Sequence, residues 1–125
     1  MRPRRVVITG LGALTPIGNT LPEYWEGLLT GTSGAAPITL FDASGFKTQF
    51  ACEVKGFDPM EFMDRKEARK CDRFTQFALV STDEAIADSG LDFEKEDCDR
   101  IGVIWGSGVG GLETFQNEML NHASG

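Results

Sequence analysis

Two short apolar runs lie near the two ends of the chain, and a glycine-rich turn follows each of them. Residues 5–9 are rich in β-branched side chains and end at Gly10, and residues 101–105 lead into the glycines of residues 106–111. Short apolar runs bounded by such turns are typical of buried strands. The pattern therefore predicts one strand at Arg5–Thr9 and another at Ile101–Trp105.

Helical periodicity fills much of the chain between these runs. Asn19 or Thr20 is suited to cap a first helix that stops near Gly31. The longest helical pattern runs from Asp64 to Asp88, where Ser89–Gly90 ends it. A last helix is expected to begin near Gly111.

The segment between the first two helices is less regular. Residues 32–48 are rich in Ser, Gly, Ala and Pro, which predicts a surface loop. A weak alternation predicts a short strand at Gln49–Val54, and Asp58 is placed to cap a brief helical turn.

The resulting order is strand, helix, irregular segment, long helix, strand and helix. Apolar strands that alternate with helices predict an α/β fold with a parallel sheet. The long helix contains many small residues, which would let another backbone lie close to it; they are Ala78, Ser81, Thr82, Ala85 and Ala87.

Composition narrows the class of protein. The 125 residues are enough for one domain, and their net charge of -7 predicts no binding to nucleic acid or to an anionic membrane. No apolar run approaches the ~18 residues of a membrane span. The cysteines Cys52, Cys71 and Cys98 are odd in number and lack C-x-x-C spacing, which argues against a disulfide framework or a zinc site. A reducing, cytoplasmic location is the simplest interpretation.

The second glycine turn is the first candidate site. It contains Gly106, Gly108, Gly110 and Gly111, and three of them spell G-x-G-x-x-G. That spacing after a strand and before a helix is typical of a dinucleotide fingerprint. The fingerprint normally opens its domain, whereas a strand and two helices precede it here. The pattern alone leaves open a dinucleotide site, a structural turn and the lining of another ligand pocket.

A basic segment is the second candidate. Residues 64–73 hold five basic and three acidic side chains in an otherwise acidic chain. At helical spacing, Lys66, Arg69, Lys70 and Arg73 would share one face. Such a face is either a solvated surface or a docking site for an anionic partner.

Catalytic residues are not evident. The only histidine is His122, no carboxylate pair stands out, and none of the cysteines has a neighbouring base that would activate it. The residues alone predict no catalytic set and no metal site in this chain.

Three stretches together resemble one family. Residues 6–19, 65–74 and 101–112 are similar, in order and in spacing, to the N-terminal part of the β-ketoacyl-acyl carrier protein synthases, most of all to the type II enzymes. The resemblance implies an α/β, thiolase-like fold with αβαβα layers and a homodimer. It also implies an acyltransferase of fatty-acid biosynthesis, which condenses an acyl-enzyme with a malonyl carrier protein in a decarboxylating Claisen reaction.

The resemblance also assigns roles to individual residues. Val109 matches an aliphatic position at the acyl-chain end of the pocket, so its substitution is expected to alter chain-length preference. Lys66, Arg69 and Lys70 match a basic patch that meets the acidic acyl carrier protein. No cofactor is implied, because the substrates are carried on the phosphopantetheine of the carrier protein. Cys71 stands where related sequences usually have methionine.

The family's nucleophilic cysteine and its two histidines would lie beyond residue 125. Residues 1–125 are therefore expected to form an incomplete N-terminal synthase domain, inactive alone and prone to aggregation. Two alternatives are a Rossmann-type oxidoreductase fragment that uses Gly106, Gly108 and Gly111, and a non-catalytic module that binds a carrier protein through the basic segment.

Overall fold

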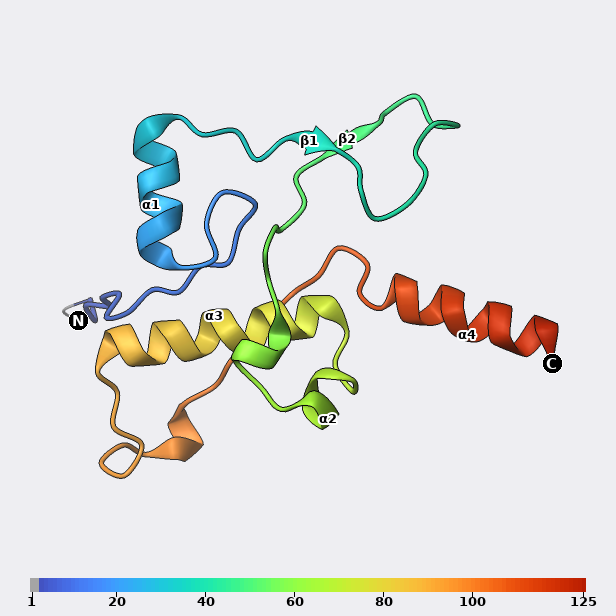
Figure 1. Ribbon diagram of the computed structural model, residues 1–125. Helices are drawn as coiled ribbons and strands as arrows, with labels where there is room; N and C mark the ends of the chain where they lie inside the picture. Colours follow the sequence, from blue (N-terminus) through green and yellow to red (C-terminus); the bar gives the residue numbers. More distant parts are fainter. Residues whose placement is uncertain (1–2) are drawn as a thin grey trace.

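The computed structural model describes residues 3–125, and a central helix, α3 (Arg73–Ser89), organises them (Figure 1). Helix α4 projects away from one end of α3 toward the C-terminus. The other elements, in chain order, are α1 (Leu21–Thr30), β1 (Ala36–Pro37), β2 (Phe50–Ala51), η1 (Pro59–Glu61), α2 (Arg65–Ala68), η2 (Cys98–Arg100) and α4 (Leu112–Ser124).

The predicted helix ends are confirmed where a local cap defines them. Thr20 caps α1, and its hydroxyl accepts a hydrogen bond from the Glu23 amide at 3.4 Å. Gly31 and Gly90 end α1 and α3 in the left-handed conformation, with φ of 68° and 66°. Left-handed backbone at a helix end favours glycine because glycine has no Cβ to clash.

The prediction of one helix from Asp64 to Asp88 is wrong, because the chain breaks between α2 and α3. Asp64 caps α2 by accepting hydrogen bonds from the amides of Lys66 and Glu67. Asp72 then adopts an extended backbone (ψ 155°) and starts α3 afresh. The Gln76 amide group donates to the carbonyls of Ala68, at 2.9 Å, and Cys71, at 3.2 Å. These bonds satisfy acceptors that the end of a helix leaves free.

The predicted strands at residues 5–9 and 101–105 do not form within residues 3–125. The sheet found there is a two-stranded antiparallel pair, with Ala36 opposite Ala51. Strands are defined by hydrogen bonds to a neighbour, and neither predicted strand has such a neighbour in the described chain. Their apolar side chains are accordingly exposed, Ile8 by 82% and Ile104 by 100%. The weak strand at Gln49–Val54 is confirmed in part as β2.

The turn after the first segment and most of the second segment nevertheless lie beside α3. A groove of about 420 Å³ is lined by small residues of α3, by Thr9, Gly10 and Gly12, and by residues 102–105. A Cβ added at Gly12 would lie 2.0 Å from the carbonyl oxygen of Ser81, and one at Gly10 would lie 2.3 Å from that of Ala85. The small residues of α3 therefore do admit a second backbone, as their pattern predicts.

Two carboxylates of α3 bind the loop that precedes α1. Glu84 accepts hydrogen bonds from the amides of Ala13, at 2.8 Å, and Leu21, at 2.7 Å. Asp88 accepts one from the amide of Leu11 at 2.9 Å. Because the donors lie more than 60 positions earlier in the chain, these bonds fix the first loop and the start of α1 against α3.

A carboxylate just after β2 also binds the loop between β1 and β2. Glu53 accepts hydrogen bonds from the Thr39 hydroxyl at 2.6 Å and from the Thr39 amide at 3.0 Å. These bonds favour the charged carboxylate and so hold the pKa of Glu53 below its usual value.

Few side chains are buried in the described chain. The buried residues other than glycine are Ala43, Ala68, Val80 and Ser81. Large apolar side chains remain exposed on the unpaired segments and on α4, where Phe115 is 65% exposed. None of the helices in residues 3–125 is long and apolar enough to cross a membrane.

Candidate functional site

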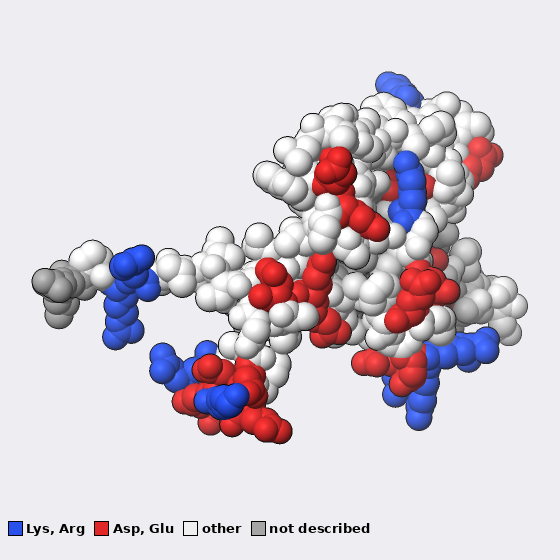
Figure 2. Space-filling model, turned by 60° about the vertical axis from the view of Figure 1, so that its left-hand side comes forward, with Lys and Arg blue, Asp and Glu red and all other residues white. Residues whose placement is uncertain are grey.

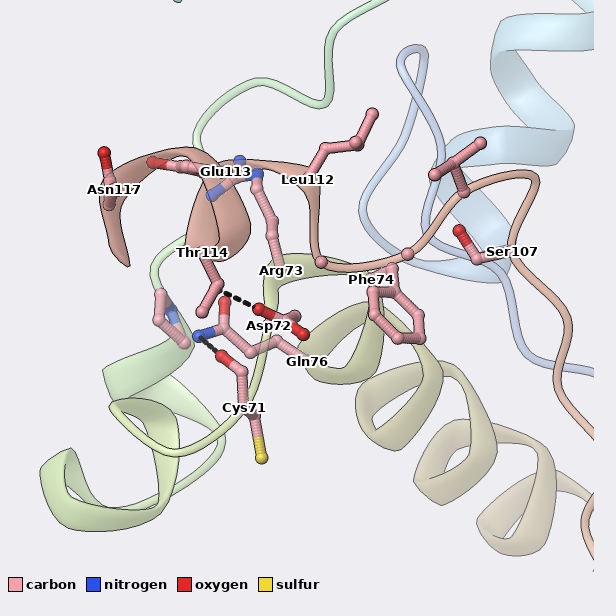
Figure 3. A pocket seen from close by; sticks show the side chains of 14 residues that line it. Cys71, Asp72, Arg73, Phe74, Gln76, Ser107, Leu112, Glu113, Thr114 and Asn117 are labelled. Carbon is pink, nitrogen blue, oxygen red and sulfur yellow. Dashed lines mark hydrogen bonds between the residues drawn. The ribbon is translucent and has the colours of Figure 1, made fainter. Parts of the chain in front are cut away.

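A pocket of about 530 Å³ lies where the start of α3 meets the second glycine turn and α4 (Figure 3). Three short segments supply nearly all of its walls: the α2–α3 junction with the first turn of α3, the glycine turn, and the first turns of α4. The lining residues are Pro59, Cys71, Asp72, Arg73, Phe74, Gln76, Ser107, Val109, Gly110, Gly111, Leu112, Glu113, Thr114 and Asn117.

The two halves of the glycine turn differ in their surroundings. A Cβ added at Gly110 would lie 2.7 Å from the ring of Phe74, and one at Gly111 would lie 3.1 Å from a carboxylate oxygen of Asp72. Gly111 also has a φ of 70° as the N-cap of α4. Gly106 and Gly108, in contrast, have nothing within 4 Å of such a Cβ. Only the half of the turn next to α4 is therefore sterically restricted to glycine.

Asp72 joins the two sides of the pocket. It stands at the N-cap of α3, yet its side chain makes no hydrogen bond to the amides of its own helix. Instead it accepts a hydrogen bond from the hydroxyl of Thr114 in α4, as Figure 3 shows. Asp72, Phe74 and Thr114 were not predicted from the sequence as site residues. The aspartate that breaks the helical pattern is the signal that could have pointed to the first of them.

Val109 lies in the pocket wall, between the open and the restricted halves of the turn. Its side chain is 68% exposed, so it can contact a ligand without first being uncovered. A β-branched side chain at this position presents a short, stiff apolar surface to the cavity. The pocket therefore combines an apolar contact at Val109 with a polar wall around Asp72.

The basic segment is placed differently from the sequence expectation. Lys66 lies in α2, and Arg69 and Lys70 lie in the turn that follows it, all three exposed. Arg73 belongs to α3, and its guanidinium lies 5.6 Å from the ring centroid of Phe57 and 5.0 Å from that of Phe77. The prediction of one helical face for all four residues is wrong, since α2 ends at Ala68.

The basic segment belongs to a chain with more acidic than basic residues. On the face that Figure 2 shows, acidic side chains are scattered among uncharged ones, and Lys and Arg side chains project mainly from the edges. Lys66, Arg69 and Lys70 follow one another within five positions, so they form a local concentration of positive charge. Such a concentration in a chain of net charge -7 would attract an anionic partner to one place.

The remaining candidate residues have no catalytic arrangement within the described chain. Cys52 and Cys98 are exposed, Cys71 is half-buried, and all three are free thiols. His122 is exposed in the last turn of α4. No group of three or more His, Cys, Asp or Glu side chains in residues 3–125 is arranged to hold a metal ion.

Comparison with protein families gives a match over nearly the whole chain. The family described as "Beta-ketoacyl synthase, N-terminal domain" matches residues 3–125. The 3-oxoacyl-(acyl-carrier-protein) synthase 2 of Synechocystis sp. is 49% identical over 119 residues, which are 95% of this chain and 29% of that protein. The protein of the same name from Coxiella burnetii is 52% identical over 112 residues, which are 90% of this chain and 27% of that protein. The chain thus spans less than a third of the length of these relatives.

Solved structures give a consistent result. The ishigamide ketosynthase/chain length factor is 41% identical to this chain and superimposes with a TM-score of 0.66, over 73% of this chain and 23% of that one. A type II PKS acyl-carrier protein in complex with its ketosynthase gives a TM-score of 0.55 at 24% identity, again over 73% of this chain and 23% of that one. The second likeness shows the fold alone.

Proposed function

The chain belongs to the β-ketoacyl synthase family, as its N-terminal domain, and we propose that it serves an enzyme that elongates fatty acids. In this proposal the enzyme is a cytoplasmic homodimer that condenses an acyl-enzyme with a malonyl group held on acyl carrier protein. The observation that supports it most is the 49% identity over 119 residues to a 3-oxoacyl-(acyl-carrier-protein) synthase 2. The nucleophilic cysteine and the histidines would come from outside residues 1–125.

Within that enzyme the present chain would supply binding surfaces. The pocket beside Val109 would receive the far end of the acyl chain, and Lys66, Arg69 and Lys70 would meet the acidic carrier protein. The family membership also weighs against a dinucleotide fingerprint at Gly106, Gly108 and Gly111. In its place, the glycines at 110 and 111 serve the close contacts with Phe74 and Asp72.

A domain exchange tests the proposed function. The aligned 119-residue segment of the Synechocystis relative is replaced by the segment of this chain, and condensation of acyl and malonyl carrier proteins is measured. We expect a kcat/KM within about tenfold of the relative's own, a loss of about 1.4 kcal/mol of transition-state stabilisation at most.

Two controls define this experiment. The same chimera with the relative's nucleophilic cysteine replaced by alanine gives the background rate, and the unmodified relative gives the upper limit. A chimera that folds and dimerises like the relative, yet condenses no faster than the background, would refute the proposed function. Calorimetry with NADH on the 125-residue chain addresses the dinucleotide alternative, which requires saturable binding.

Charge reversal tests the docking surface. We expect the chimera with Lys66→Glu and Lys70→Glu to bind acyl carrier protein roughly tenfold more weakly, because each exposed charge contributes up to ~1 kcal/mol and repulsion replaces attraction. The loss should shrink as salt rises, since salt screens exposed charges. Binding is measured by titration at two ionic strengths.

The matched control changes the net charge equally at other exposed sites, with Lys47→Glu and Lys95→Glu. This pair should leave the affinity for the carrier protein within about twofold of the starting value. Equal losses in the two variants would mean that net charge alone matters, and the assigned docking surface would then be wrong.

A further inference from the structure

The N-cap aspartate of α3 has an unusual partner. An N-cap Asp normally accepts a hydrogen bond from an amide in the first turn of its own helix, and this bond stabilises the helix. The side chain of Asp72 makes no such bond. It reaches instead to Thr114, 42 positions later in the chain. The contact therefore joins two distant segments rather than completing α3.

The same carboxylate also lies against the backbone of the glycine turn. One oxygen of Asp72 accepts the Thr114 hydrogen bond, and the other faces Gly111 so closely that an added Cβ would lie 3.1 Å from it. Asp72 is half-buried at this point. The carboxylate is thus fitted between the end of the turn and the first turn of α4.

Phe74 forms the adjoining contact, with Gly110, the residue before Gly111. An added Cβ at Gly110 would lie 2.7 Å from the Phe74 ring, so the turn backbone lies directly on the ring. Asp72 and Phe74 both belong to the start of α3, and together they support two successive residues of the turn. Val109 is the next residue back along the chain, so its position in the pocket wall depends on these contacts.

We propose that Asp72 is a positioning residue that fixes the glycine turn through Thr114, places Val109 in the pocket wall and so determines the acyl-chain length that the pocket accepts. The effect on chain length rests on the proposed function. The effect on the turn does not, because it concerns only contacts within residues 72–114. Phe74 supplies the apolar support, and Asp72 supplies the polar anchor that determines how far the turn approaches α3.

The absence of a cap bond makes the proposal testable. Because the Asp72 carboxylate does not cap α3, its hydrogen bond can be removed without uncapping the helix. Thr114→Val removes the donor while keeping a β-branched side chain of nearly the same shape. Two conservative variants should keep the contact. Thr114→Ser retains the hydroxyl donor, and Asp72→Asn retains an oxygen acceptor.

The first measurement uses the full 125-residue chain. We expect Thr114→Val to raise amide hydrogen exchange about tenfold at Phe115, whose amide donates to the Gly111 carbonyl at 2.9 Å, and to leave exchange in the middle of α3 unchanged. Thr114→Ser should keep the exchange of the starting chain. Unchanged exchange at Phe115 in the valine variant, or an equal rise throughout α3, would overturn the positioning role.

The second measurement uses the domain-exchange chimera and the lengths of its products. Thr114→Val should broaden the range of product lengths, because the turn that carries Val109 loses the hydrogen bond that ties it to Asp72. The serine variant should restore the narrow range. If the starting chimera condenses normally and the valine variant keeps the same range, the proposal fails while the proposed function stands. If the starting chimera is inactive, the proposed function fails, and the exchange measurement still decides whether Asp72 positions the turn.

Discussion

Gly12→Ala is expected to detach the first loop from α3 and to destabilise the fold by about 3 kcal/mol or more, at the upper end of overpacking effects. The new Cβ would lie 2.0 Å from the carbonyl oxygen of Ser81 and 2.8 Å from the amide nitrogen of Ala85. Both are backbone atoms of a helix, which cannot rotate away as the end of a flexible side chain could. Urea unfolding and amide exchange in α3 measure the effect.

Gly108→Ala is the matched control for this substitution. Gly108 also lies in a glycine turn, but a Cβ there would meet nothing within 4 Å. Its substitution should change the free energy of unfolding by no more than ~0.5 kcal/mol. Similar destabilisation by the two alanines would show that the close approach of residue 12 to α3 is not what holds the loop in place.

Glu84→Ala should have the second largest effect. The carboxylate accepts hydrogen bonds from the Ala13 and Leu21 amides, and a bond to a charged group contributes about 1.5–3 kcal/mol. Losing both is expected to cost about 3 kcal/mol, despite the high helix propensity of alanine. Amide exchange should rise selectively at residues 13 and 21, while α3 itself remains helical by circular dichroism.

Asp83→Ala provides the comparison on the same helix. Asp83 is the exposed neighbour of Glu84, so its loss should change stability by less than about 0.5 kcal/mol. Glu84→Gln should fall between the two alanine variants, since a side-chain amide has only one oxygen to accept with. If residues 13 and 21 remain protected in Glu84→Ala, the carboxylate does not hold the loop.

Local signals in the sequence predicted the helix ends well. Thr20, Gly31, Gly90 and Gly111 all lie at ends where a cap or a left-handed residue is required. These features depend on a few neighbouring residues, so the order of amino acids is enough to reveal them. The small residues of α3 were also informative, because they predict that another backbone segment packs closely against the helix, wherever that segment lies in the chain.

Features that depend on distant partners were not predictable in the same way. The apolar runs at residues 5–9 and 101–105 have the composition of strands, but a strand also needs a hydrogen-bonding neighbour, and none is present in residues 3–125. The break between α2 and α3 depends on Gln76, which satisfies carbonyls five and eight positions earlier. The partner of Asp72 lies 42 positions away, and no spacing rule links it to Thr114.

The contact between Asp72 and Thr114 also bears on how such domains can be recombined. A crossover placed between these two positions would join α3 from one parent protein to the glycine turn and α4 from another. Asp72 of the first parent would then face the residue that the second parent has at position 114. Libraries built from ketosynthase parents should therefore inherit residues 72–114 as one block. Lys66, Arg69 and Lys70, the proposed docking residues, lie just outside that block, and Cys71 alone separates them from it, so a junction there would allow the proposed docking surface and the pocket to be exchanged separately.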